Sequence, residues 1–212
     1  MSNELIVRHL YALSNNRETK FADWVAYVVR EEWIGPEEDR GWADDPDLDP
    51  DETLETRDYD DISALQADRG HQAPLGSFTN APDWPETNYI SNITPQSLNL
   101  NRGRWRRLED AERNLARREH VPVFVITGPL YERPMPALPR ADEPHRVPSG
   151  YWKIVATADG RALGFIFENR RETGRYCAFQ RDISEIERRS GLNLFPAVDP
   201  NALRPLAREI GC

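Results

Sequence analysis

The tetrapeptide Ala158-Asp159-Gly160-Arg161 constrains the fold more than any other stretch of the sequence. It separates two runs rich in β-branched and aromatic residues, Tyr151 to Thr157 and Ala162 to Glu168. Asp-Gly between two such runs is a strong signal for a β-hairpin. We therefore expect two adjacent antiparallel strands here.

Most of the remaining regular structure is also predicted to be β. Leu5 to Leu13 and Phe21 to Arg30 are predicted strands, joined by a turn at Ser14-Asn15-Asn16. Val121 to Thr127 is a predicted buried strand that ends at Gly128-Pro129. The fold class that follows is α+β, with a central antiparallel β-sheet flanked by helices and long loops.

Two helices are expected in the second half of the chain. Asn101 to Glu119 carries apolar residues at three- and four-residue spacing, and Asp182 to Ser190 has Asp182 as its N-cap and Gly191 as its stop. Short strands are expected at Asn88 to Ile93 and Tyr176 to Gln180. The region that ends with the first helix therefore has the local order β, β, α.

Two long loops are predicted, at 33–61 and at the Pro-rich stretch 134–148. The first is acidic, and we expect it to be chiefly a solvated excursion. Its exception is Arg40-Gly41-Trp42, where Trp42 either serves only as a packing anchor or also aims Arg40 toward an anion.

The length of 212 residues fits one domain, 1-212. No apolar run approaches the roughly 20 residues of a membrane helix, so a soluble protein with no membrane partner is expected. The start, Met-Ser-Asn-Glu, lacks the features of a signal peptide. This leaves a cytoplasmic protein and a mature secreted form as alternatives.

The net charge of −9 is distributed unevenly. Residues 37–61 hold thirteen acids against two arginines, whereas residues 101–118 hold seven arginines against three acids. Local field rather than mean charge governs the docking of a charged ligand. The basic stretch therefore keeps a nucleic-acid partner open despite the negative total.

The stretch Asp68-Arg69-Gly70-His71-Gln72-Ala73-Pro74 carries the strongest chemical signal. A neutral histidine can act as a base near pH 7, although an isolated histidine is more often structural. Asn101, Glu109 and Arg113 follow on the predicted helix, and at 100° per residue they span an arc that faces one cleft. Together these residues predict a phosphodiester-cutting site whose activity falls between pH 8 and pH 5 as His71 gains a proton.

These segments resemble the DNA/RNA non-specific endonuclease family of the ββα-metal (His-Me finger) superfamily. The residues that carry the resemblance are Asp68 to Leu75, Asn88 to Gln96, Leu100-Asn101-Arg102-Gly103, Trp105, Leu108-Glu109-Asp110, Lys20 to Tyr27, Thr127 to Arg133 and Tyr151-Trp152-Lys153. The resemblance covers nearly the whole chain and implies a ββα-metal finger at the active site.

The resemblance also implies roles for individual residues. His71 falls on the general base, Asn101 on the direct ligand of Mg²⁺, for which Mn²⁺ can substitute, and Glu109 on the carboxylate that holds metal-bound water. Arg69, Arg113 and Arg40 fall on phosphate-contacting arginines. The supporting positions are Asn88, Asn92 and Gln96, which shape the site, and Asp68, which is expected to brace the local backbone or Arg69.

The implied activity is hydrolysis of single- and double-stranded DNA and RNA to 5′-phosphorylated oligonucleotides. Two alternatives remain: a non-catalytic module that binds nucleic acid, and the same nuclease used as a delivered antibacterial toxin. The family also implies a homodimer.

The two cysteines, Cys177 and Cys212, cannot form a zinc site by themselves, and their spacing fits a disulfide and two free thiols equally well. Both match a cysteine pair of the family, so the resemblance implies that they form a disulfide. A secreted or periplasmic location follows from that pairing.

Overall fold

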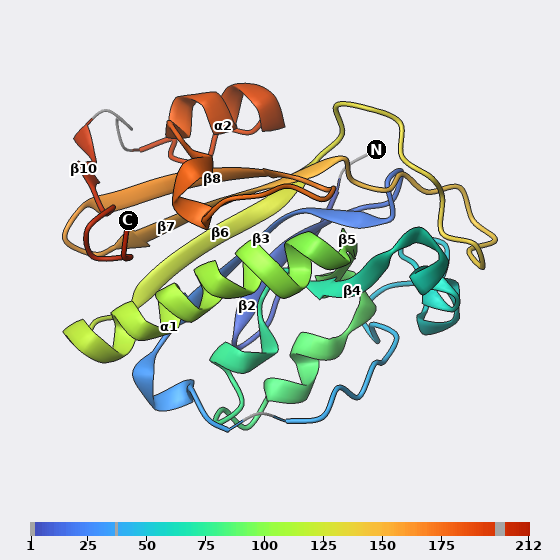
Figure 1. Cartoon of the computed structure of the whole chain (residues 1–212). Helices are drawn as coiled ribbons and strands as arrows, with labels where there is room; N and C mark the ends of the chain where they lie inside the picture. The colour runs from blue at the N-terminus through green and yellow to red at the C-terminus, as the bar shows by residue number, and fades with distance from the viewer. Residues whose placement is uncertain (1–2, 37, 198–201) are drawn as a thin grey trace.

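An eight-stranded sheet dominates the computed structural model, which describes residues 3–36, 38–197 and 202–212 (Figure 1). The strand order is β1-β2-β3-β6-β7-β8-β10, with β9 also paired to β8. All neighbours are antiparallel except β8 and β10. The bounds are Glu4–Val7 (β1), Tyr11–Asn16 (β2), Phe21–Val29 (β3), Val123–Leu130 (β6), Gly150–Thr157 (β7), Arg161–Glu168 (β8), Gln180–Arg181 (β9) and Arg204–Pro205 (β10). The predicted α+β class with a central antiparallel sheet is confirmed.

The hairpin predicted around Asp159-Gly160 is also confirmed. Strands β7 and β8 pair in a register that places Ala156 opposite Ala162. Gly160 has a φ of 83°, a conformation that residues with a side chain adopt at a cost. The turn therefore depends on a residue without a Cβ.

The N-terminal prediction was wrong in two respects. Leu5 to Leu13 is not one strand but parts of β1 and β2, which pair with Ile6 opposite Leu13. Ser14-Asn15-Asn16 lies in β2 because Asn15 is fully buried and its Nδ2 donates to the Glu52 carbonyl at 2.9 Å. The turn comes later, where Lys20 has a φ of 66°.

Strand β6 does not end at Gly128-Pro129 but continues to Leu130. Its pairing with β3 stops at Thr127, whereas its pairing with β7 runs on to Leu130. A proline is tolerated where one side of a strand needs no backbone donor. Gly128 fits here because a Cβ would lie 2.3 Å from the Asp23 carbonyl oxygen.

The strand predicted at Tyr176 to Gln180 is instead a 3₁₀ helix, Tyr176–Phe179, followed by the short β9. The Tyr176 hydroxyl donates to the Ile210 carbonyl at 2.6 Å, and Cys177 forms a disulfide with Cys212. Tertiary contacts with the C-terminal segment thus override the local β-propensity. The disulfide implied by the resemblance is present.

Two helices cover opposite faces of the sheet (Figure 1). On one face, α1 (Arg106–Glu119) packs Leu108 and Leu115 into a cluster with Tyr151 and Val155. On the other, α2 (Ile183–Ser190) packs Ile183 and Ile186 against a cluster that includes Trp152 and Ile154. Because successive side chains of β7 point to opposite faces of the sheet, they contribute to two separate apolar layers. The prediction for α2, between Asp182 and Gly191, is confirmed.

A two-stranded antiparallel ribbon, β4 (Ala67–His71) with β5 (Ile93–Ser97), precedes α1. A π-helical turn, Leu100–Trp105, leads into α1, so the predicted β, β, α order is confirmed. The strand predicted at Asn88 to Ile93 was wrong, because residues 84–92 form two 3₁₀ turns held by buried side-chain hydrogen bonds from Asn92. The second strand starts only at Ile93.

Among the described residues, no helix is long and apolar enough to cross a membrane.

The disulfide should contribute substantially to stability, because it closes a loop between positions 35 residues apart and ties the C-terminal segment to the sheet. The chain-entropy model gives about 3 to 4 kcal/mol for a loop of this length. We expect the double variant Cys177→Ser, Cys212→Ser to lose an amount of this order in urea unfolding, compared with the oxidised parent. Reduction of the parent should reproduce the loss, and an unchanged midpoint in both experiments would contradict the prediction.

Candidate active site

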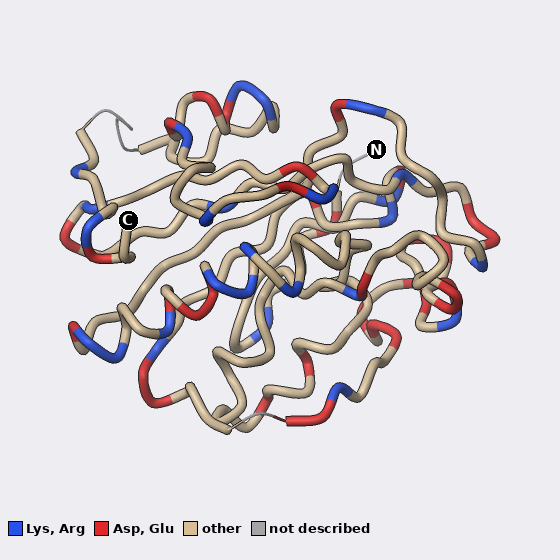
Figure 2. The backbone as a smooth tube through the Cα atoms, in the orientation of Figure 1, with Lys and Arg blue, Asp and Glu red and all other residues tan. Residues whose placement is uncertain are grey.

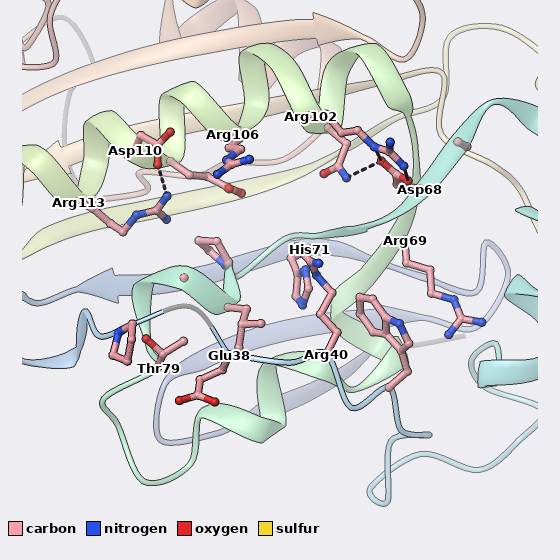
Figure 3. Close-up of a pocket in the computed structure, with 18 of the residues that line it drawn as sticks. Glu38, Arg40, Asp68, Arg69, His71, Thr79, Arg102, Arg106, Asp110 and Arg113 are labelled. Atoms are coloured by element: carbon pink, nitrogen blue, oxygen red, sulfur yellow. Dashed lines mark hydrogen bonds and ion pairs between the residues drawn. The ribbon is translucent and has the colours of Figure 1, made fainter. Parts of the chain in front are cut away.

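A pocket with a cavity volume of about 770 Å³ lies between α1, the ribbon and the acidic loop (Figure 3). In Figure 3, Arg106, Asp110 and Arg113 project from α1 on one side, and Glu38 and Arg40 face them from the loop. The predicted site residues that line this pocket are Arg40, Asp68, Arg69, His71, Asn101, Glu109 and Arg113. The folded chain therefore brings together segments that are up to 73 positions apart.

Gly70 permits the close packing that places His71 at the end of β4. It lies opposite Thr94 in the ribbon, and a Cβ at this position would lie 2.5 Å from Oε1 of the buried Gln96. A larger residue would have to displace the buried Gln96 side chain. Gln96 thus shapes the strand from behind and does not line the pocket.

His71 is buried, with 9% of its surface exposed. Its Nε2 lies 3.0 Å from Oδ1 of Asn88. An amide oxygen only accepts hydrogen bonds, so Nε2 carries the proton and Nδ1 is the free acceptor of the neutral ring. The Trp42 ring lies against the imidazole, with centroids 5.1 Å apart. These two contacts fix both the tautomer and the plane of the ring.

Burial lowers the pKa of His71 to about 4, partly offset by the hydrogen bond with Asn88 and assisted by the positive charge of Arg40. The lowered pKa favours the neutral imidazole, the form in which a histidine acts as a base. The expected fall in activity between pH 8 and pH 5 stays a prediction, and the lowered pKa of His71 places that fall toward the acid end of the range.

Asn101 is oriented by Asp68. The Nδ2 group of Asn101 donates to Asp68 Oδ2 at 3.1 Å, which leaves the amide oxygen of Asn101 free for a ligand. Asp68 also accepts two hydrogen bonds of 2.7 Å from Arg102. Burial acts to raise the pKa of Asp68, but the bonds from Arg102 and Asn101 outweigh it and lower the pKa. Asp68 thus braces Asn101 and Arg102, not Arg69 as one of the expected alternatives had it.

Glu109 reaches the pocket from the first turns of α1 and is 9% exposed. Burial raises its pKa to about 7, against the opposing effects of Lys153 and Arg113. Its Oε1 is buried without a hydrogen-bond partner among the described residues. The nearest cation is Lys153, whose Nζ lies 3.9 Å from this oxygen, beyond hydrogen-bond distance, so the carboxylate keeps capacity to accept hydrogen bonds.

The donor set fits a hard divalent cation. The free amide oxygen of Asn101 and the carboxylate of Glu109 line the same pocket, and magnesium prefers a few oxygen ligands supplemented by water and phosphate. Asp68 fixes the orientation of Asn101, as outer-shell partners of metal ligands commonly do. The residues present therefore fit a divalent metal ion that keeps part of its water shell.

The arginines of the pocket are held by different elements. Arg69 donates to the Thr56 carbonyl at 2.9 Å and lies over the Trp42 ring at 5.5 Å. Arg113 pairs with Asp110 and donates to Ser77 Oγ at 3.3 Å. Figure 2 shows basic residues interspersed with acidic ones along α1, and mainly acidic residues along the loop opposite. The pocket wall thus offers several guanidinium groups to an anion.

The acidic loop is not simply a solvated excursion. Asp45, within it, is 4% exposed and contacts both Arg8 and Ser91. Ala43 pairs with Tyr89, and the Ile90 amide donates to the Ala43 carbonyl at 3.0 Å. These contacts fasten the loop next to Asn88. Trp42 is confirmed as a packing anchor.

Two groups of residues were assigned incompletely from the sequence. Arg102 and Arg106 also line the pocket, and with Arg113 they recur at helical spacings of four and seven residues, a signal that the sequence contained. Asn92 lies outside the pocket lining, where its side chain bonds to the backbone of Ala73 and Thr87 at 2.8 to 2.9 Å. Asn92 therefore braces the chain that leaves β4.

Comparison with known proteins gives a consistent result. A model of the DNA/RNA non-specific endonuclease family matches residues 1–201. A nuclease from Serratia marcescens is 42% identical over 99% of this chain and 82% of its own length, and nuclease C1 from Cunninghamella echinulata is 27% identical over 100% and 90%. The solved structure of an EndoG/EndoGI complex covers 95% of this chain and 89% of the matched chain, with a TM-score of 0.76 at 24% identity. This last likeness shows a shared fold.

The buried neutral His71 should make folding stability depend on pH. Its folded-state pKa, about 4, lies below the ordinary value of 6.5, so the unfolded chain takes up the proton first as the pH falls. The stability contributed by the neutral ring is present above pH 6.5 and is lost as the pH falls toward 4. We expect the parent to lose roughly 3 kcal/mol more than His71→Gln between pH 7 and pH 4 in urea unfolding with EDTA. Parallel pH profiles would contradict this.

Proposed function

Because this chain belongs to the DNA/RNA non-specific endonuclease family, whose members hydrolyse phosphodiester bonds, we propose that the pocket beside β4 and α1 is its active site and that Mg²⁺ is its metal. The observation that carries the proposal is the meeting of His71, Asn101 and Glu109 in one pocket lined by arginines. His71 comes to the pocket from β4, Asn101 from the π-helical turn and Glu109 from α1.

His71 acts as the general base. With Nε2 held by Asn88, its free Nδ1 takes a proton from water as the water attacks phosphorus in line with the leaving 3′ oxygen. The low pKa keeps this nitrogen unprotonated at neutral pH. The attacking group is water and not the ribose 2′-OH, so DNA and RNA are both cut. The bond that breaks is between phosphorus and the 3′ oxygen, which takes a proton from a water molecule held by Glu109, so the products carry a 5′-phosphate and a 3′-hydroxyl.

Asn101 would hold the metal through its amide oxygen, and the Glu109 carboxylate would orient water beside it. The ion, when bound, stabilises negative charge that develops on the phosphate and on the leaving oxygen. Asp68 keeps the Asn101 amide in one orientation. The protein thus would contribute few direct metal ligands, and neighbouring side chains fix the orientation of Asn101.

Arg40, Arg69 and Arg113 neutralise the remaining charge of the phosphate. Preorganised donors stabilise a developing charge most effectively, and Arg69 and Arg113 are already held by neighbouring groups. Arg40 lies on the acidic loop and reaches the pocket because Trp42 is packed beside His71. The loop therefore completes the phosphate site.

An oxidising compartment, extracellular or periplasmic, is the proposed location, since the Cys177–Cys212 disulfide would persist there. A homodimer is proposed on the family resemblance and is tested by light scattering during size-exclusion chromatography.

The proposed activity is tested directly by incubation of plasmid DNA and of RNA with the protein, in Mg²⁺ and in EDTA. Cleavage of both substrates only with Mg²⁺, and products that ligate through 5′-phosphates, are expected. Intact substrate in both conditions, with retained binding, would instead identify a non-catalytic nucleic-acid-binding module.

Loss of the proposed base should abolish most of the activity. His71→Ala is expected to reduce the rate by about 10²- to 10⁴-fold because removal of a general base costs this much, whereas substrate affinity should change little. Initial rates and a binding titration on the same oligonucleotide separate the two effects. A rate close to that of the parent would assign the base elsewhere.

Loss of the proposed ligand should change the use of metal. Asn101→Ala is expected to need a much higher Mg²⁺ concentration for half-maximal rate, since the amide oxygen is removed from the pocket. Activity is measured across a Mg²⁺ series, with Asn80→Ala, at an exposed position outside the pocket lining, as the matched control. An unchanged Mg²⁺ response would place the ligand on another residue.

A further inference from the structure

Lys153, one of only two lysines in the chain, is fully buried in the middle of β7. It shares the α1 side of the sheet with Tyr151 and Val155, two residues on either side of it, both of which belong to the apolar cluster beneath α1. An unpaired ammonium group in such a place would cost several kcal/mol. Its contacts must therefore compensate for the loss of water.

Four groups surround the Lys153 ammonium. Its Nζ lies 3.2 Å from Oε1 of Glu112 and 3.9 Å from Oε1 of Glu109. It donates to the Tyr27 hydroxyl at 3.1 Å and lies 4.1 Å from the centroid of the Trp105 ring. The Tyr27 hydroxyl in turn donates to Oε2 of Glu112 at 3.0 Å. Lys153 thus contacts the two carboxylates that α1 directs toward the sheet.

These contacts connect the interior to the active-site pocket. Glu112 and Lys153 are fully buried, whereas the Glu109 side chain is 12% exposed and lines the pocket. One oxygen of Glu109, Oε1, is directed at Lys153, which leaves the other oxygen for the pocket. A carboxylate attracted at one oxygen cannot rotate freely about its last bond. The geometry therefore supplies a means of orienting Glu109.

We propose that Lys153 is a positioning residue for the nuclease reaction: it holds Glu109, from inside the protein, in the orientation that serves the metal. This inference rests on the proposed role of Glu109. The stability of the fold does not by itself require a cation at this position, because a buried ion pair can often be replaced by apolar residues without loss of stability. The pair of Lys153 and Glu112 is instead placed directly behind the one carboxylate that the pocket needs.

The test removes the cation together with its fully buried partner, Glu112. Lys153→Met combined with Glu112→Gln replaces the interior ion pair by neutral groups of similar length, so the fold is expected to persist. Lys153→Arg keeps the charge and serves as the conservative variant. Lys20→Met applies the same substitution to the other buried lysine, which lies outside the pocket lining and bonds to the Asp51 carbonyl.

Two measurements are made on each variant: Mn²⁺ binding without substrate, by electron paramagnetic resonance, and the rate of plasmid cleavage in Mg²⁺. The neutral pair variant is expected to weaken Mn²⁺ binding and to slow cleavage by about 10- to 100-fold, the usual effect of removing an outer-shell partner. Lys153→Arg should recover most of both quantities, and Lys20→Met should match the parent. An equal loss in the folded Lys153→Arg and the folded neutral pair variant would overturn the inference. If the pair variant proves unstable, loss of Mn²⁺ binding in folded Lys153→Arg overturns it alone.

A double-mutant cycle separates this inference from the proposed function. If Lys153 acts through Glu109, the neutral pair substitution should have little further effect in a Glu109→Gln background. Full activity of Glu109→Gln alone would refute the proposed role of Glu109 itself. Additive losses in the cycle, or parental Mn²⁺ binding in the folded pair variant, would refute the positioning role of Lys153 and leave the nuclease assignment intact.

Discussion

The packing of α1 against the sheet determines the geometry of everything around the pocket. Leu108, Leu115 and Ala116 are fully buried, and Trp105 is 1% exposed, so the rotation of the helix about its axis is fixed by its apolar side. Full burial of each large apolar side chain is worth roughly 1.5 to 3 kcal/mol. Together these contributions are large enough to offset the cost of drawing the polar Glu109 partly out of water. The apolar stripe therefore decides where the polar residues of the same helix point.

The ribbon and the π-helical turn complete this arrangement from the other side. Insertion of an extra residue into a helical turn changes the direction of the side chains before it relative to those after it, and such turns are frequent at functional sites. The turn at Leu100–Trp105 presents Asn101 to Asp68 of β4, whereas the regular helix beyond it presents Glu109 to the same pocket. The acidic loop adds the third wall because buried Asp45 fastens it beside the ribbon.

Local signals in the sequence predicted those elements whose formation depends on neighbouring residues. The hairpin at Asp159-Gly160 and the helix after Asp182 are of this kind. The strand expected at Asn88 to Ile93 failed because its asparagines bond to distant backbone and to His71, which propensity does not encode. Alternation along β7 places Lys153 on the same side as Tyr151, yet nothing local shows that two carboxylates of α1 lie above it. The sequence motif located the proposed site residues. The contacts through which these residues hold one another in place became apparent only in the fold.

Burial shifts the pKa values of two groups of the pocket, His71 and Glu109, in opposite directions. It lowers the pKa of His71 to about 4, which keeps the proposed base in its neutral form, and it raises the pKa of Glu109 to about 7, which opposes the charge that its proposed metal-orienting role needs. Lys153 and Arg113 work against that second effect without cancelling it. The same buried environment therefore favours the proposed base without assistance, whereas the proposed role of Glu109 requires nearby positive charge, which Lys153 supplies from within the protein and a cation bound in the pocket would add.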